Sequence, residues 1–478
     1  MFKHFEDICG IPHGSGNEKA LSDYILKFAK DRGLWAVQDE MHNLIVKIPA
    51  SKGYENADTV IIQAHLDMVC EKNKSSNHDF ENDPIDVYAE GDWVKANGTT
   101  LGADNGIAVA YGMALMEMAG QAGFEHPPLE IVLTTLEEVG LEGAAFLCAK
   151  ELDGKMLINI DTEEEGFLLT GCAGGSKPSV RIPAPRIAAP DGCVAYSLEV
   201  KGLKGGHSGM EIDKKRANAN RLMARLLHEI VEDEGVYLAH VSGGLKDNAI
   251  TREAEAVLLI ESKFADNCID KINSLGIILS KEYRKTDDGL QILFNPVEKF
   301  EGANSVFMPK AARAVVQALM LLPNGPLEMS ADFEGVVETS NNIGVVVTEE
   351  TNVVITCAVR SSVGSRKEFV KKQIEAVAEL VGATVAHRGE YPAWEYEPNS
   401  KLRDVFAEVY ERMYGKEAEQ GVIHAGVECG LFAEKIQGLD MVSFGPNMYD
   451  VHTPDEKVSI SSTKRSWEYL LEVLKALK

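Results

Sequence analysis

The stretch Val60-Ile61-Ile62-Gln63-Ala64-His65-Leu66-Asp67 decides the fold class of this chain. It begins as a short apolar run, which is typical of a strand buried on both faces of a sheet. The run ends in His-x-Asp, and open α/β sheets place their sites at the carboxyl ends of strands. Two residues apart on an extended chain, His65 and Asp67 point the same way. A single His-x-Asp is still more often a surface histidine than a site.

Short apolar strands and helices alternate on both sides of this stretch. The spacing of Leu21, Ile25 and Phe28 predicts a helix over residues 18–32, with its apolar side chains on one face. A second, apolar helix is expected over residues 106–119. Further strands are expected over residues 44–48, 129–135 and 156–160. This alternation predicts an α/β fold, in which helices cover both faces of a mixed β-sheet.

The composition changes near residues 183–192, where three prolines and a glycine fall within ten residues. Such a cluster favours a crossing between domains. Beyond it the pattern is α+β, with strands expected over 195–200, 255–261 and 353–359 and helices over 214–232 and 365–380. Near Pro392 the α/β character returns, with a helix over 402–414, a strand over 441–444 and a last helix from Ser461. We expect one domain of residues 1–187 and 391–478, split by an inserted domain of residues 188–390.

Length and charge exclude several classes of protein. A chain of 478 residues is too long for one compact core. Asp and Glu outnumber Lys and Arg by 74 to 48, for a formal charge of −26, so neither nucleic acid nor an anionic membrane is an expected partner. The run at residues 60–62 is far too short for a membrane span. The acidic N-terminus does not resemble a signal peptide, and the 8 cysteines are dispersed. We therefore expect a cytoplasmic protein with free thiols.

Further acids and a histidine stand at similar places along the chain. Asp104 lies in Leu101-Gly102-Ala103-Asp104-Asn105-Gly106, just before an expected helix, where it could also be an ordinary N-cap. Glu137 and Glu138 follow the strand over 129–135. Two adjacent carboxylates at a buried strand end lose hydration and repel each other, so they need a cation or shared protons. Asp161 ends another apolar strand, and His452 lies on a loop after the strand over 441–444.

Together these strand-end side chains suit a pair of divalent cations. Imidazoles and carboxylates are the ligands of zinc, and two such ions about 3.5–4 Å apart recur in aminopeptidases. One carboxylate must bridge the ions, and another must remain free as a base. The number of acids found here meets both needs.

The ordered set of these motifs resembles family M20 of the clan MH dinuclear zinc peptidases, and within it the branch of bacterial aminoacyl-histidine dipeptidases. The set comprises His65-x-Asp67, Gly102-Ala103-Asp104-Asn105-Gly106, Glu137-Glu138-x-Gly140, Asp161 and His452. The resemblance runs from Ile11-Pro12-His13-Gly14-Ser15-Gly16 to the last helix. It implies a catalytic domain split by an inserted lid domain.

The resemblance also implies two Zn²⁺ per chain, with Co²⁺ or Mn²⁺ as substitutes. Asp104 would bridge the ions, with a cis peptide bond between Asp104 and Asn105. His65 and Asp161 would complete the ligands of one ion, and Glu138 and His452 those of the other. Glu137 would act as general base and then as acid, and Asp67 would orient His65 through its second ring nitrogen.

Four residues of the inserted domain and the segment after it are implied to bind the substrate. His207, in Lys204-Gly205-Gly206-His207-Ser208-Gly209, resembles a lid histidine that stabilises the tetrahedral oxyanion. Asn248 and Arg360 would hold the carboxylate of the substrate. Gly426 lies in a loop that shapes the pocket. His207 could instead be an ordinary loop residue, and Arg360 could form a surface ion pair.

The implied activity is the hydrolysis of dipeptides, including Xaa-His dipeptides. Two alternatives remain open: the same metal chemistry on tripeptides or N-acyl amino acids, and a non-catalytic, metal-stabilised protein that binds peptides. A small peptide substrate and a homodimer are the expected partners. In dimeric relatives the lid histidine reaches the other active site. The insert is about twice as long as one small lid unit, which leaves open the alternative that it supplies His207 within its own chain.

Overall fold

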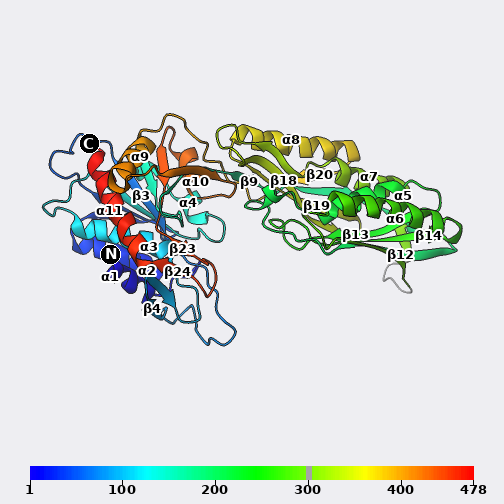
Figure 1. The fold of residues 1–478 in the computed structure, drawn as a ribbon, viewed down its shortest axis with the longest axis horizontal. Helices are drawn as coiled ribbons and strands as arrows, with labels where there is room; N and C mark the ends of the chain where they lie inside the picture. The colour runs from blue at the N-terminus through cyan, green and yellow to red at the C-terminus, as the bar shows by residue number, and fades with distance from the viewer. Residues whose placement is uncertain (298–303) are drawn as a thin grey trace. The chain divides into compact units, whose positions relative to one another are not determined.

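Two compact units make up the chain in the computed structural model, which describes residues 1–297 and 304–478 (Figure 1). Unit 1 comprises residues 1–172, 394–422 and 427–478, and unit 2 comprises residues 173–393 and 423–426. The first boundary therefore differs from the expected one at residue 187. Strand β10 (Ser179–Pro183) pairs with strands of unit 2, so the proline-rich segment after it lies inside that unit.

Unit 1 is built on an eight-stranded sheet. Its strands, in order across the sheet, are β1 (Trp35–Gln38), β2 (Leu44–Ile48), β6 (Leu129–Thr134), β3 (Val60–His65), β7 (Met156–Asn159), β22 (Asp440–Ser443), β8 (Phe167–Cys172) and β21 (Glu419–Ile423). The central strands β6, β3, β7 and β22 run parallel to one another. Their carboxyl ends therefore meet at one edge of the sheet.

Every residue of β3, β6 and β7 is buried, which shows that both faces of the sheet are covered. The helices of this unit are α1 (Phe2–Cys9), α2 (Lys19–Asp31), α3 (Ala103–Met118), α4 (Glu142–Phe146), α9 (Lys401–Tyr414), α10 (Cys429–Lys435) and α11 (Ile460–Ala476). A small four-stranded sheet adds β23 (Met448–Tyr449), β24 (Lys457–Ser459), β5 (Trp93–Ala96) and β4 (Val87–Glu90). The predicted α/β fold, with a mixed sheet and helices on both faces, is confirmed.

Helix α3 is a buried helix whose first residues are not helical. Almost all of its residues are buried, including Tyr111, and it packs against β3 and α1. Its regular part starts at Gly106, because Asp104 and Asn105 have non-helical backbone angles. The predicted helix over residues 106–119 agrees with this regular part. Asp104 thus lies at the junction between a loop and a buried helix.

Unit 2 contains a ten-stranded antiparallel sheet. The strands along its main path are β15 (Gln291–Pro296), β12 (Cys193–Lys201), β14 (Ala254–Glu261), β13 (Val236–Gly243), β18 (Val337–Thr348), β19 (Asn352–Ser361), β10 and β20 (Thr384–Ala386), with β17 (Gly325–Met329) on β18 and β9 (Gly174–Ser176) on β19. A separate pair joins β11 (Arg186–Ala188) to β16 (Ser305–Phe307). The helices α5 (Ala219–Ile230), α6 (Ala265–Glu282), α7 (Pro309–Leu321) and α8 (Gly364–Val381) lie along this sheet (Figure 1).

The sheet of unit 2 consists of two copies of one arrangement. In chain order, β12-α5-β13-β14-α6-β15 forms one copy and β10-α7-β18-β19-α8-β20 the other. Across the sheet the copies read β15-β12-β14-β13 and β20-β10-β19-β18, which is the same strand order. They join where β13 pairs with β18. The long insert is therefore an internal duplication, with one copy inserted into the other.

Helix α5 begins at Ala219, five residues later than the predicted 214. Lys215 has a left-handed backbone conformation, with φ at 54°, which a continuous helix does not allow. The side chain of Asn218 then accepts a hydrogen bond from the backbone N–H of Arg221 and caps the helix. The helical spacing of apolar residues continues across this turn, so the sequence alone placed the start too early.

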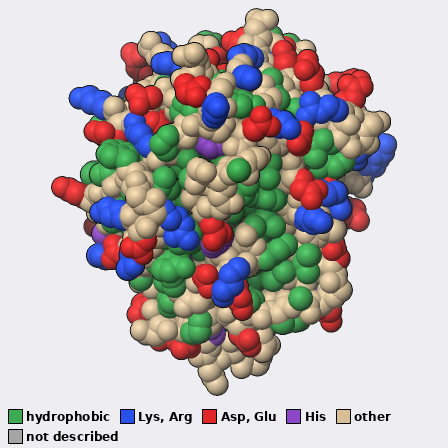
Figure 2. Space-filling model, turned by 90° about the vertical axis from the view of Figure 1, so that its left-hand side faces the viewer, with side chains coloured by type: hydrophobic (Ala, Val, Ile, Leu, Met, Phe, Trp, Pro, Cys, Tyr) green, Lys and Arg blue, Asp and Glu red, His purple; other side chains and the backbone are tan. Residues whose placement is uncertain are grey.

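The acidic side chains do not gather into one patch on the face drawn in Figure 2. Lys and Arg side chains are interspersed among the Asp and Glu side chains there. On α2, for example, Lys19 pairs with Asp23 and Lys27 with Asp31, each one helical turn apart. Among the described residues, no helix combines the length and the apolar character that a membrane span requires.

Replacing Gly445 by alanine should destabilise unit 1. A Cβ atom at this position would overlap the backbone carbonyl oxygen of Thr162, next to Asp161. Overpacking of this kind costs about 1–3 kcal/mol of the free energy of unfolding, measured by urea denaturation. The control is Gly276→Ala in α6, where a Cβ finds only ordinary contacts and a gain of about 0.5–1 kcal/mol is expected. Equal stability of Gly445→Ala and the unmodified protein would contradict this close approach.

Candidate metal centre

The candidate site lies in unit 1, at the edge of the sheet where four neighbouring parallel strands end. The register of the sheet aligns these ends: His65 pairs with Thr134 across β3 and β6, and Gln63 pairs with Asn159 across β3 and β7. His65 ends β3 and Asp67 follows it, Glu137 and Glu138 follow β6, and Asp161 follows β7, while His452 lies on the loop between β23 and β24, beyond the end of β22. The structure therefore brings together side chains that are far apart in the sequence.

Asp104 lies at the centre of this group. Its Oδ1 is 3.1 Å from Nε2 of His65, and its Oδ2 is 3.2 Å from Nε2 of His452. The two oxygens of one carboxylate thus face two imidazoles, one at the end of β3 and the other on the loop between β23 and β24. The peptide bond between Asp104 and Asn105 is cis, as the resemblance implies.

Two groups of possible metal ligands share this carboxylate. One group is His65, Asp104 and Asp161; the other is Asp104, Glu138 and His452; within each, the donor atoms lie within 4.8 Å of one another. Nε2 of His65 is 3.5 Å from Oδ1 of Asp161, and Nε2 of His452 is 2.9 Å from Oε1 of Glu138. Imidazole nitrogens and carboxylate oxygens are the donor set that zinc takes. The residues therefore fit two divalent cations joined by one carboxylate.

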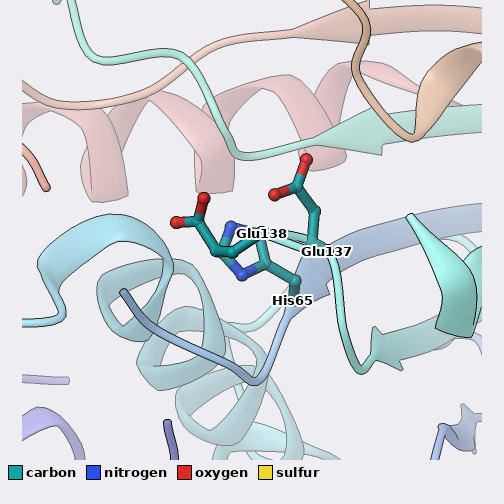
Figure 3. Close-up of side chains that lie close together, drawn as sticks. All are labelled: His65, Glu137 and Glu138. Atoms are coloured by element: carbon teal, nitrogen blue, oxygen red, sulfur yellow. The ribbon is translucent and has the colours of Figure 1, made fainter. Parts of the chain in front are cut away.

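Glu137 stands beside these two groups but belongs to neither. It shares only a third group, with His65 and Glu138. Figure 3 shows that both glutamates extend from one turn beside the His65 ring, with their carboxylates directed apart. The Glu137 carboxylate therefore lies near the two ligand groups but is not part of either.

The electrostatics of the site call for added positive charge. Burial raises the pKa of Glu137 well above its ordinary value and that of Asp161 to about 6. Hydrogen bonds with Asp104 and Glu138 raise the pKa of His452 to about 11. Carboxylates at a buried edge lose hydration, so they stay ionised only beside a positive charge. A protonated imidazole or a bound cation can provide that charge.

Asp67 connects one histidine to the turn that carries both glutamates. Its backbone carbonyl oxygen lies 3.0 Å from Nδ1 of His65, and its Oδ1 lies 3.5 Å from the same nitrogen. The backbone N–H of Glu137 donates to Oδ1 at 2.9 Å, and that of Glu138 donates to Oδ2 at 3.2 Å. The buried Asp67 carboxylate therefore fixes the turn at residues 137–138, and its backbone carbonyl lies against the His65 ring.

Two N-terminal residues that the sequence did not single out support this turn. The Ser15 hydroxyl donates to Oδ2 of Asp67 at 2.8 Å. Oε1 of the buried Glu18 accepts hydrogen bonds from the backbone N–H groups of Gly16 and Leu136, at 2.9 and 3.1 Å. Ser15 lies within the motif at residues 11–16, but no local pattern shows that a carboxylate 52 residues later is its partner.

Glu456 is a third residue whose importance the sequence did not reveal. Its buried carboxylate accepts hydrogen bonds from four successive backbone N–H groups, those of Leu101, Gly102, Ala103 and Asp104, at 2.8, 3.1, 2.8 and 3.4 Å. Glu456 thereby ties the loop that carries His452 to the loop that carries Asp104. Its place four residues after His452 was visible, but the contact spans more than 350 residues of sequence.

The predicted substrate-binding residues lie in unit 2. The His207 loop runs beside the Asn248 loop, because the backbone N–H of Ser208 donates to the carbonyl oxygen of Asn248 at 2.8 Å. A Cβ atom on Gly209 would lie 3.0 Å from Cε1 of His207 and 3.2 Å from Nε of Arg360, so these two side chains approach the same glycine. The side chain of Asn248 is exposed.

Gly426 contacts a side chain that the sequence did not point to. A Cβ atom at Gly426 would lie 3.1 Å from Cζ of Tyr391, so only glycine leaves room for that ring. The Tyr391 hydroxyl in turn accepts a hydrogen bond from Nη1 of Arg360 at 3.0 Å. The loop at Gly426 is therefore connected to Arg360 through the tyrosine.

Comparison with known proteins gives consistent results over the whole chain. A model of peptidase family M20/M25/M40 matches residues 61–476. The cytosol non-specific dipeptidase of Escherichia coli (strain K12) is 40% identical over 473 residues, which are 99% of this chain and 96% of that protein.

Solved structures agree with this result. The aminoacylhistidine dipeptidase from Vibrio alginolyticus has a TM-score of 0.93 at 39% identity, over 100% of this chain and 96% of that one. Aminopeptidase PepT from Bacillus cereus has a TM-score of 0.58 at 15% identity, over 100% of this chain and 97% of that one, which shows a shared fold alone. The family match and the identity along almost the whole length show that this chain belongs to peptidase family M20/M25/M40.

Proposed function

We propose that this enzyme is a zinc-dependent dipeptidase whose substrates include Xaa-His dipeptides. The observation that carries the proposal is the Asp104 carboxylate, which two groups of imidazole and carboxylate ligands share, with Glu137 beside them. The names of the relatives from Escherichia coli and Vibrio alginolyticus support the substrate class.

The two ligand groups would hold two zinc ions, for which cobalt or manganese could substitute. His65 and Asp161 would bind one ion, Glu138 and His452 the other, and Asp104 both. When bound, such a pair of ions polarises the peptide carbonyl and makes water more acidic. Asp67 would keep the His65 ring in place, since Nδ1 of His65, the ring nitrogen on the side away from Asp104, lies against Asp67.

Glu137 would act as the general base. It would take a proton from the attacking water and return that proton to the amine that leaves. Glu137 belongs to neither of the two ligand groups that share Asp104, so its carboxylate stays free to accept a proton. Hydrogen bonds from the backbone N–H groups of residues 137 and 138 to Asp67 hold the turn, so that the carboxylate starts from a fixed position.

The residues of unit 2 would bind the rest of the substrate. We propose that His207 stabilises the oxyanion and that Asn248 and Arg360 hold the free α-carboxylate. The half-buried Arg360 side chain supports this assignment, because a guanidinium binds a carboxylate through two parallel hydrogen bonds. Gly426 would shape the pocket indirectly, through the ring of Tyr391. Recognition of a free carboxylate would restrict productive binding to short peptides.

We place the enzyme in the cytoplasm, as the name of the Escherichia coli relative suggests, and expect a homodimer. In unit 2, a single copy would leave the edge of β13 free to pair with another chain, whereas here β18 of the second copy occupies it. A homodimer would therefore not form by strand pairing at that edge.

The proposal is tested by hydrolysis of β-Ala-His, Gly-His, a tripeptide and an N-acetyl amino acid, each after chelation and after zinc is restored. We expect zinc-restored cleavage of the dipeptides alone, because a bound carboxylate limits the length of the substrate. Zinc-dependent cleavage of the tripeptide or of the acyl substrate would instead overturn the substrate class. A lack of any turnover with zinc bound would favour the non-catalytic alternative.

Substitution of Glu137 by glutamine should lower kcat by about 10²–10⁴-fold while zinc stays bound, because the amide cannot accept the proton. Zinc content is measured on the same sample by elemental analysis. Glu138→Gln should by contrast lose zinc, since it removes a proposed ligand. Glu142→Gln, an exposed position on α4, is the control and should change neither quantity. Zinc loss in Glu137→Gln would move that residue into the ligand set and refute its role as a base.

A further inference from the structure

Arg360 in unit 2 carries a guanidinium that lacks an ionic partner. Within residues 1–297 and 304–478 no carboxylate forms an ion pair with it. Its Nε is buried and makes no hydrogen bond, and its Nη1 donates to the hydroxyl of Tyr391. A half-buried charge without a counter-ion is costly, so this side chain is prepared for an anion that the folded chain does not provide.

The groups around Arg360 do not neutralise it. His207 reaches the same glycine, Gly209, and the backbone carbonyl oxygen of His424 also faces that position. Burial and the nearby guanidinium lower the pKa of His207 and lower that of His424 to about 3. Both imidazoles are therefore neutral near pH 7, so neither histidine adds a charge beside Arg360.

Tyr391 is held more firmly than a loop tyrosine usually is. Its backbone N–H and carbonyl pair with Gly175 at 3.1 and 3.0 Å, and Nζ of Lys367 donates to the same carbonyl oxygen at 2.8 Å. Its ring lies against two backbones, since a Cβ atom at either Gly175 or Gly426 would collide with ring atoms. The ring cannot rotate away, so the hydroxyl has a fixed position.

The hydrogen bond from Nη1 to this hydroxyl fixes the orientation of the guanidinium. The planar fork of arginine binds a carboxylate through two hydrogen bonds only when its plane is set correctly. An arginine side chain otherwise has many rotamers and loses affinity when one of them must be selected. A rigid tyrosine that accepts from one Nη selects the rotamer before the ligand arrives.

We propose that Tyr391 is a positioning residue that sets the Arg360 fork for the free α-carboxylate of the substrate and so determines the preference for peptides with a free carboxyl terminus. This inference rests on the proposed function. With the rigid Tyr391 in place, the enzyme would prefer a free carboxyl terminus more strongly than with Arg360 alone. It also gives Gly426 a physical role, because that glycine makes room for the tyrosine ring.

The test compares kcat/KM for Gly-His with that for Gly-His-amide, which lacks the carboxylate. The unmodified enzyme should prefer the free acid. In Tyr391→Phe the ratio of acid to amide should fall about tenfold, through a higher KM for Gly-His. Tyr237→Phe is the matched control, because it removes from unit 2 another part-buried hydroxyl, bonded to Glu261, and should leave the ratio unchanged.

A second variant separates positioning from loss of folding. Arg360→Lys keeps the charge but removes the fork, so the ratio should fall, and Tyr391→Phe added to it should lower the ratio no further. An unchanged ratio in Tyr391→Phe, or equal losses on both substrates, would overturn the role of the tyrosine. Equal rates of the unmodified enzyme on acid and amide would overturn the assignment of Arg360. No turnover of Gly-His would overturn the proposed function itself.

Discussion

The repulsion among carboxylates at one edge of a buried sheet is the constraint on which the rest of unit 1 depends. Four parallel strands end together, and Asp104, Glu137, Glu138 and Asp161 meet there with two histidines. Such a group stays ionised only beside positive charge. The surrounding contacts hold the group in a geometry that two cations would fit. Asp67 fixes one turn, and Glu456 fixes the loop before Asp104.

Much of this site could be predicted because most of its side chains follow apolar strands that short stretches of sequence reveal. Apolar strands over residues 60–65 and 129–134 are visible in the sequence, and the acids directly follow them. Since parallel strands place their carboxyl ends at one edge, strand-end acids from distant segments are expected to meet. For His65, Glu137, Glu138 and Asp161 the prediction needed only the strand ends, whereas Asp104 stands at the non-helical start of α3 and His452 on a loop. The roles of these residues as ligands and base remain proposals.

The parts that could not be predicted depend on long-range contacts. Ser15 and Glu456 look like ordinary loop residues, and only the fold shows that they bind Asp67 and the backbone before Asp104. The boundary near residue 172 was missed because the proline-rich segment signals a turn within unit 2 as strongly as a crossing between units. The two copies in unit 2 share strand order rather than an evident sequence repeat, so the duplication was visible only as excess length.

The central claim is that Asp104 joins two cations. The most direct measurement is anomalous diffraction at the zinc absorption edge, from crystals of the protein grown with zinc. The account predicts two peaks about 3.5–4 Å apart, one beside each oxygen of Asp104. One peak would lie near His65 and Asp161, and the other near Glu138 and His452. A single peak, or two peaks that do not share Asp104, would contradict the account.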